Sequence, residues 1–378
     1  MARCKCRRAP HFHELGCRRH HGRPATARSS AQGTILIRHP QHFDSRQERE
    51  HIVQGKIALE EHFAIPETLQ DSAGFVPGDY WKELSARLLD IQEKRLRLMD
   101  AHGIEKMILS LNAPAVQAIP DRAKALEISR RANDFLAEQC VKNPNRFLGF
   151  AALPLQDPDA ATQELQRCVT TMGFVGALVN GFSQEGDGTT PLYYDLPQYR
   201  SFWAEVEKLN VPFYLHPRNP LPQDSRIYAG HSWLMGPTWA FAQETAVHAL
   251  RLMGSGLFDE HPALRIIVGH MGEGLPYMMW RIDNRNAWVK VEKSYPAKRP
   301  IADYFNENFY ITTSGNFRTQ SLIDAMLEIG ADRILFSADW PFENIDHAAN
   351  WFDSATISEA DRLKIGRTNA VSLFKLDR

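Results

Sequence analysis

The stretch Lys56-Ile57-Ala58-Leu59-Glu60-Glu61-His62-Phe63 begins an alternation of short apolar segments with amphipathic segments of helical length that continues to the C-terminus. Its apolar and β-branched residues predict a buried strand, although the strand ends in three ionisable residues. No glycine-rich dinucleotide fingerprint follows it, which argues against a doubly wound sheet. The alternation therefore predicts an α/β protein built from repeated strand and helix units.

Eight segments have the character of strands, and a helical segment follows each of them. The expected strands are Lys56–Phe63, Lys106–Leu111, Phe147–Leu153, Val175–Val179, Val211–His216, Leu264–His270, Phe309–Ser314 and Arg333–Asp339. The expected helices are Leu88–His102, Ala123–Lys142, Pro158–Met172, Gln198–Leu209, Ala240–Phe258, Leu275–Val291, Thr319–Ile329 and Glu359–Phe374. This pattern predicts a (β/α)₈ TIM barrel with insertions, in which functional groups gather at the carboxyl ends of the strands.

The first 54 residues differ from the rest of the chain. They carry 11 Lys and Arg against 4 Asp and Glu, and they contain few large apolar residues. We expect residues 1–54 to be a disordered extension without chemistry and residues 55–378 to form a single barrel domain. Two alternatives stay open for the extension: a zinc site, although Cys4, Cys6 and Cys17 lack the usual knuckle spacing, and an organelle-targeting peptide.

Composition narrows the class of protein further. The 378 residues include no window of about 18 apolar residues, and the Arg-rich N-terminus has no apolar core of a secretory signal. Only two of the five cysteines lie beyond residue 54, so a disulfide framework is not expected. These features predict a soluble, cytoplasmic protein that binds neither nucleic acid nor membranes.

Ionisable residues fall at the ends of several expected strands. Period-2 alternation puts Ala58, Glu60 and His62 on one face of the first strand, with Leu59 and Glu61 on the other. The first-strand pair Glu60 and His62 is therefore expected to point into the barrel.

Three later strands end in His216, His270 and Asp339. A single histidine in such a place is more often a hydrogen-bonded structural residue than a ligand. Two histidines and two carboxylates from strands one, five and eight would nevertheless repel or remain unpaired without a cation. This donor set suits Zn²⁺ or Mn²⁺ better than Mg²⁺ or Ca²⁺.

Several motifs now carry a family resemblance. They are Ala58-Leu59-Glu60-Glu61-His62-Phe63-Ala64-Ile65-Pro66, Leu215-His216-Pro217-Arg218, Gly269-His270-Met271-Gly272-Glu273 and Phe336-Ser337-Ala338-Asp339-Trp340-Pro341-Phe342-Glu343. From Lys56 to about Asp377 the chain resembles the metal-dependent amidohydrolase superfamily, in the decarboxylase branch whose first strand carries Glu-x-His instead of His-x-His. The resemblance implies reversible, non-oxidative decarboxylation of a hydroxybenzoate, with 2,6-dihydroxybenzoate giving resorcinol and CO₂ as the foremost expectation.

The resemblance also implies roles for individual residues. The metal ligands would be Glu60, His62, His216 and Asp339, and His270, supported by Glu273, would act beside the metal. Asp339 is the expected proton donor, with His270 as the alternative. Dinuclear hydrolases carry a carboxylated lysine on strand four, where this chain has Asn180, so one metal and no organic cofactor are expected.

Substrate recognition is expected from the loops that follow the strands. Phe75 and Trp239, together with Trp81, Pro237 and Phe241, could form an apolar slot for a planar ring, although loop packing explains them equally well. Arg218 or Arg281 could neutralise the carboxylate of a small aromatic substrate. In relatives an Arg at the position of Arg281 reaches into a neighbouring subunit's site, which implies a homodimer or homotetramer.

Two other functions compete with the decarboxylase. One is a mononuclear hydrolase of a cyclic amide or lactone, which Glu60 disfavours because hydrolases have histidine there. The other is a non-catalytic barrel that binds an aromatic acid as a sensor, which the full set of ionisable residues disfavours.

Overall fold

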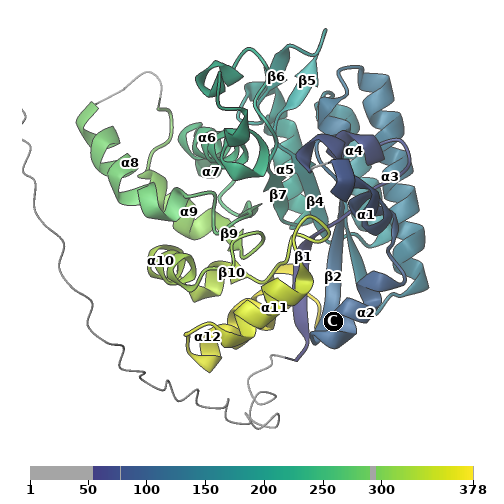
Figure 1. The fold of residues 1–378 in the computed structure, drawn as a ribbon. Helices are drawn as coiled ribbons and strands as arrows, with labels where there is room; N and C mark the ends of the chain where they lie inside the picture. Colours follow the sequence, from purple (N-terminus) through teal and green to yellow (C-terminus); the bar gives the residue numbers. More distant parts are fainter. Residues whose placement is uncertain (1–53, 77, 290–294, 378) are drawn as a thin grey trace, which may run out of the picture. The chain divides into compact units, whose positions relative to one another are not determined.

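The computed structural model describes residues 54–76, 78–289 and 295–377 (Figure 1). Its main sheet has eight parallel strands in the order β1-β2-β3-β4-β7-β8-β9-β10. These strands are β1 Lys56–Phe63, β2 Ile104–Leu111, β3 Phe147–Ala151, β4 Gly176–Asn180, β7 Phe213–His216, β8 Ile266–Val268, β9 Phe309–Thr312 and β10 Ile334–Leu335. The (β/α)₈ prediction is confirmed, whereas the predicted extension up to residue 53 lies outside the described residues.

Helices surround the strands (Figure 1). They are α1 Gly78–Leu89, α2 Lys94–Ala101, α3 Arg122–Lys142, α4 Pro158–Met172, α5 Arg200–Leu209, α6 Ala240–Gly254, α7 Leu257–Glu260, α8 Leu275–Val289, α9 Ile301–Asn308, α10 Thr319–Ile329, α11 Ile345–Ser354, α12 Glu359–Leu363 and α13 Asn369–Phe374. A short antiparallel hairpin of β5 Ser183–Glu185 and β6 Thr190–Leu192 follows β4. The hairpin, α9 and α11 are insertions that the sequence pattern did not predict.

The predicted helix Leu88–His102 is wrong in its first part. In the structure α1 ends at Leu89 and α2 begins at Lys94, with a break between them. Asp90 causes this break, because its carboxylate accepts hydrogen bonds from the backbone N–H groups of Glu93 at 2.9 Å and Lys94 at 2.7 Å. A side-chain acceptor of this kind favours a new helix start over continuation of the old helix.

A bulge interrupts the predicted alternation of side chains along β1. Ala58 pairs with Met107 and Glu61 with Leu109, so three steps along β1 match two steps along β2. Leu59 consequently packs in the inner apolar cluster while Ala58 packs in the outer one, the reverse of the predicted assignment. Because of the extra residue, the strand matches the predicted alternation only at its carboxyl end, where Glu60 and His62 lie in the cluster of polar side chains.

Two apolar layers hold the barrel together. The outer layer lies between strands and helices, and the inner layer fills the barrel below the strand ends. The inner layer consists of Ile57, Leu59, Ile108, Phe150, Leu178, Tyr214, Ile267 and Leu335, with Ala370, Leu373 and Phe374 of α13 packed against them. This filled interior leaves the carboxyl ends of the strands as the place for polar chemistry.

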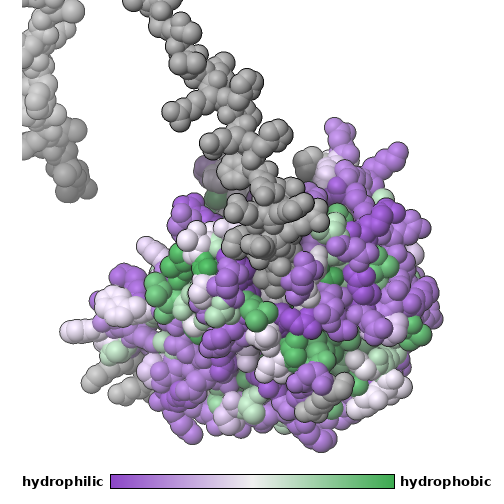
Figure 2. All heavy atoms as spheres, turned by 90° about the horizontal axis from the view of Figure 1, so that it is seen from below, coloured by the Kyte–Doolittle hydropathy of each residue, from purple (hydrophilic) through white to green (hydrophobic). Residues whose placement is uncertain are grey.

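One face of the protein is mostly polar. The face shown in Figure 2 is dominated by hydrophilic residues, and the hydrophobic residues on it form small separate patches. Within the described residues, no helix combines the length and the apolar character needed to cross a membrane.

A candidate metal centre at the carboxyl ends of the strands

The structure brings the four predicted ligands together. Glu60 and His62 lie on β1, His216 ends β7, and Asp339 follows β10. One ligand atom from each residue lies within 4.8 Å of the corresponding atoms of the other three. The side chains of Glu60 and His62 are fully buried, and that of Asp339 is 13 % exposed. The cluster therefore lies at the predicted end of the barrel and is largely shielded from water.

The donor atoms fit a divalent cation. His62 Nε2 lies 3.3 Å from Asp339 Oδ1, and His216 Nε2 lies 3.3 Å from Glu60 Oε1. Glu60 Oε1 and His62 Nε2 are buried without a hydrogen-bond partner among the described residues. Buried polar atoms in this state are costly, and a cation between them would give each one a partner. Two imidazoles and two carboxylates match the ligand preferences of Zn²⁺ and Mn²⁺.

Neighbouring hydroxyl groups fix the orientation of both ligands on β1. The Tyr214 hydroxyl and Thr312 Oγ1, the latter at 3.2 Å, donate to Glu60 Oε2, which leaves Oε1 facing the cluster. Ser110 Oγ lies 3.1 Å from His62 Nδ1, which leaves Nε2 facing the cluster. Such outer contacts set the tautomer and the direction of a ligand before a metal binds.

The charge of Glu60 is stabilised despite its burial. Burial raises the pKa of this carboxyl, but the facing His270, His216 and His62 together hold it well below its usual range. Burial lowers the pKa of His216, which favours the neutral imidazole that a metal ligand needs.

His270 and Glu273 lie beside the cluster, as predicted. His270 Nδ1 lies 2.8 Å from Glu273 Oε1, and its Nε2 lies 3.5 Å from Asp339 Oδ2 and 3.8 Å from Glu60 Oε1. Burial lowers the pKa of His270, but Glu273 and Glu60 outweigh it and hold the pKa well above its usual range. These partners favour the protonated form of the His270 imidazole, whose Nε2 faces Asp339.

The loop that carries His270 has an unusual backbone. His270, Met271 and Glu273 all have positive φ, at 51°, 58° and 54°. Gly315 lies against it with φ +60°, and a Cβ there would lie 2.7 Å from His270 Cδ2. The ring thus occupies space that only a glycine leaves free.

The predicted substrate-binding residues have more varied positions. The ring of Phe75 contacts Phe241 edge-on at 5.3 Å, and Trp239 is half-exposed just before α6. Arg218 is buried, donates to the Phe182 carbonyl at 2.7 Å and to Gln184 Oε1 at 2.8 Å, and stacks on the Phe182 ring.

Arg281, the remaining predicted contact, is exposed on α8. The structure thus places the predicted ligand and catalytic residues together. Their roles, like those of the substrate-binding residues, remain predictions.

The sequence pattern did not reveal several residues around the cluster. Tyr214 precedes His216 by two residues, so period-2 alternation places both on one face and could have revealed it. Ser110 lies on β2, next to β1, whereas Thr312 lies on β9, and only the closed barrel brings Thr312 to Glu60.

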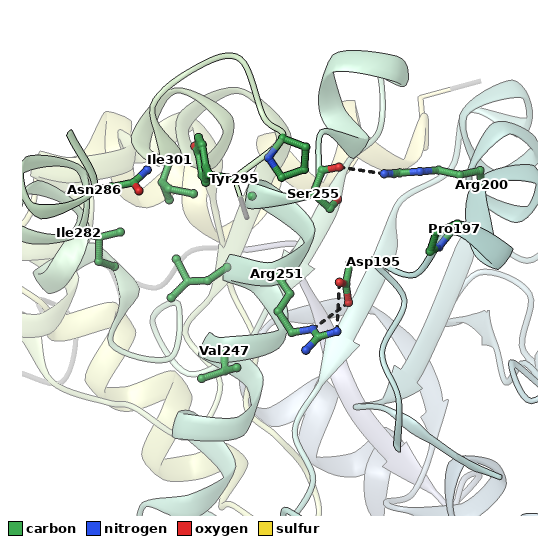
Figure 3. A pocket seen from close by; sticks show the side chains of 13 residues that line it. Asp195, Pro197, Arg200, Val247, Arg251, Ser255, Ile282, Asn286, Tyr295 and Ile301 are labelled. Atoms are coloured by element: carbon green, nitrogen blue, oxygen red, sulfur yellow. Dashed lines mark hydrogen bonds and ion pairs between the residues drawn. The ribbon is translucent and has the colours of Figure 1, made fainter. Parts of the chain in front are cut away.

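A cavity of about 710 Å³ lies elsewhere, among α5, α6 and α8 (Figure 3). The charged residues that line it are bound to other groups of the same chain. Arg251 pairs with Asp195 at 2.8 Å, and Arg200 donates to the Ser255 carbonyl at 2.9 Å. The candidate centre is therefore defined by its donor atoms and not by the size of a cavity.

Fold and site together define the class of protein. The chain belongs to the amidohydrolase family, whose model matches residues 60–376.

The chain is also very similar in sequence to individual members of the family. It is 83% identical over 325 residues to the gamma-resorcylate decarboxylase of Rhizobium sp. (strain MTP-10005), covering 86% of this chain and 99% of that protein. A crystal structure of 2,6-dihydroxybenzoate decarboxylase complexed with 2,6-dihydroxybenzoate is 83% identical, with a TM-score of 0.84 over 85% of this chain and 100% of the other. The dihydroxybenzoic acid decarboxylase of Polaromonas sp. JS666, solved with bound manganese and the inhibitor 2-nitroresorcinol, is 74% identical, with a TM-score of 0.85 over 86% of this chain and 98% of that chain. The expected place in the decarboxylase branch is confirmed.

Proposed function

We propose that the chain is a carboxy-lyase that converts 2,6-dihydroxybenzoate to resorcinol and CO₂, reversibly and without oxidation. The observation that carries this proposal is the 83% identity to a decarboxylase solved with that substrate, over 100% of its chain. Glu60, the residue that separates this branch from the hydrolases, lies within the cluster of four donors.

The proposed metal ligands are Glu60, His62, His216 and Asp339. A divalent cation, Mn²⁺ or Zn²⁺, supplies positive charge that draws the substrate carboxylate and an ortho hydroxyl to this end of the barrel and lowers the pKa of that hydroxyl. One cation is proposed, because β4 ends in Asn180, whose side-chain amide donates to the Asn112 carbonyl at 3.0 Å.

The chain's own residues supply the proton. Direct loss of CO₂ would leave an aryl carbanion, so protonation of the carboxyl-bearing ring carbon comes first. Asp339 is the proposed donor, and His270 Nε2, 3.5 Å from Asp339 Oδ2, replaces the proton it gives up. Glu273 holds the other ring nitrogen of His270 and favours its protonated form. The bond between the ring and the carboxylate then breaks, its electron pair restores the aromatic ring, and CO₂ leaves.

The proposed ring pocket combines aromatic residues from three segments that follow strands of the barrel. Phe75 and Phe241 contact each other, and the Phe342 ring lies 5.6 Å from the ring of His62. Such flat apolar walls suit an aromatic acid and keep water away from the ring carbon.

A homodimer or homotetramer is the proposed assembly. Helix α8 exposes Tyr277, Trp280 and Trp288 by 80, 75 and 76%. Large aromatic side chains exposed along one helix are typical of a protein interface, and Arg281 lies among them. Light scattering on the purified protein tests the assembly, and a monomer at micromolar concentration would contradict it.

The reaction is tested with purified Mn²⁺-loaded protein and 2,6-dihydroxybenzoate in D₂O. We expect loss of the substrate's absorbance, stoichiometric CO₂ and resorcinol with one deuterium on the carbon that carried the carboxylate. Binding of 2,6-dihydroxybenzoate without turnover would instead indicate an aromatic-acid sensor. Opening of a lactone or release of ammonia from a cyclic amide, without CO₂ from any hydroxybenzoate, would indicate a hydrolase.

A further inference from the structure

The seam between the first and last strands of the barrel is closed by an unusual set of contacts. In the described sheet, β1 and β10 stand at the two ends of the hydrogen-bonded order. Across the seam, Glu60 N–H donates to Ser337 Oγ at 2.8 Å, and His62 N–H donates to the Trp340 carbonyl at 2.6 Å. The candidate ligands on β1 and after β10 therefore depend on contacts other than a regular ladder.

Glu61 makes the most extensive of these contacts. Its side chain is fully buried on the outer side of β1. One carboxylate oxygen accepts the Ala338 N–H at 2.9 Å and Ser337 Oγ at 3.2 Å, and the other accepts the Trp340 N–H at 3.1 Å. The carboxylate thus binds the amides of the residues immediately before and after Asp339.

Asp339 needs such support because of its backbone. It has φ of 73°, in the left-handed region that side-chain-bearing residues rarely adopt. A strained conformation persists only where the surroundings over-determine it. Glu61 provides that constraint by binding the amides on either side of Asp339, and not by binding the Asp339 side chain.

Arg95 extends the arrangement to a second ligand. Its side chain on α2 is fully buried and donates to the His62 carbonyl at 2.5 Å. Burial raises the pKa of Glu61 to about 7, and the positive charge of Arg95 opposes this rise. The buried carboxylate of Glu61 therefore binds the amides on either side of Asp339, and the buried guanidinium of Arg95 binds the carbonyl of His62.

We propose that Glu61 is a positioning residue that sets the backbone of Asp339 and thereby the geometry and affinity of the metal centre. The inference deepens the proposed function and rests on it, because it assumes that Asp339 and His62 bind the metal. Only a carboxylate fits this role, since both of its oxygens face hydrogen-bond donors. Glutamine would turn an NH₂ group toward one of them.

The variants Glu61→Gln and Glu61→Asp test this role. The matched control is Glu164→Gln on α4, another fully buried glutamate, which accepts from Asn133 at 2.7 Å and Arg167 at 2.6 Å in the outer helix layer. We would measure Mn²⁺ affinity by calorimetric titration of metal-free protein, kcat and KM at saturating Mn²⁺, and thermal unfolding. We expect Glu61→Gln to weaken Mn²⁺ binding by about 10- to 100-fold and to lower kcat more than it raises KM.

The control should lose thermal stability but keep its Mn²⁺ affinity within about twofold, because it weakens hydrogen bonds and ion pairs that lie far from the metal centre. Glu61→Asp keeps the charge but is too short to reach both amides, so its Mn²⁺ affinity should fall between wild type and Glu61→Gln. If Glu61→Gln does not fold, the Glu61→Asp measurement decides the matter. Wild-type Mn²⁺ affinity and kcat in the folded variants would overturn the proposal.

These outcomes are separate from those of the proposed function. A wild-type protein that fails to decarboxylate 2,6-dihydroxybenzoate, with Mn²⁺ binding that still depends on Glu61, would remove the reaction and keep the positioning role. An active wild type with Glu61 variants that bind Mn²⁺ and turn over normally would remove the positioning role and keep the reaction.

Discussion

The two ends of the barrel interior are built from the same strands but differ in the side chains that they bury. One end buries apolar side chains, and the other buries polar ones. At the amino end, Leu59 and its neighbours form a closed apolar layer against Phe374 of α13. At the carboxyl end, Glu60 and His62 present buried polar atoms that lack partners among the described residues. The first end lowers the free energy of the folded state, whereas the second keeps polar atoms unsatisfied for a ligand. On β1 the change between them occurs within two residues, at the bulge.

The largest effect is expected from removing a ligand at the carboxyl end. His216→Ala deletes one of the four donors, so most of the bound metal and activity should be lost. The loss of several kcal/mol of transition-state stabilisation corresponds to about 10³-fold or more in kcat/KM. Metal analysis and steady-state kinetics measure both quantities. The control is His102→Ala, a histidine just before β2 at the amino end, which should keep its metal. Full activity of metal-free His216→Ala would refute the assignment of the ligands.

A smaller effect is expected from the proton relay. His270→Asn should lower kcat by about 10²-fold, the usual scale for lost acid-base assistance, and should leave the metal content unchanged. His261→Asn is a matched control, because His261 Nδ1 lies 3.0 Å from Glu207 Oε2 in a similar pair on the outside of the barrel. Equal rates for His270→Asn and wild type would exclude His270 from proton transfer.

A substitution in the apolar layer at the amino end should lower stability and leave activity unchanged. Phe374 contacts the ring of Phe150 at 5.8 Å, so Phe374→Ala should lower the free energy of unfolding by about 3 kcal/mol. At temperatures where the variant is folded, its kcat and metal content should match those of wild type. Leu327→Ala, at a leucine 83% exposed on α10, should change stability by less than about 0.5 kcal/mol. A tenfold fall in kcat for folded Phe374→Ala would show that the two ends are coupled.

The contrast also explains which parts of the molecule can be predicted from sequence. His216, His270 and Asp339 could be found because strand ends in a barrel converge whatever the details of packing. The bulge in β1 could not be found, since it depends on how β1 pairs with β2. Glu61 was predicted on the face away from the cluster and therefore received no role. Its partners lie 277 and 279 positions along the chain, and only the closed barrel brings them together.

The smallest effect is expected from the part of the chain that belongs to neither end. The Rhizobium relative is covered over 99% of its length by 325 residues of this chain, so the first segment has no counterpart there. Gly55 already joins the barrel, because its N–H donates to the Gly103 carbonyl at 3.0 Å and its own carbonyl accepts from Arg367. A chain beginning at Gly55 should therefore fold, bind one Mn²⁺ and match the kcat and unfolding temperature of the full chain. Circular dichroism, metal analysis and kinetics check these three properties. Precipitation of the shortened chain, or loss of its metal, would mean that residues 1–54 stabilise the barrel, and the domain boundary predicted at Gly55 would be wrong.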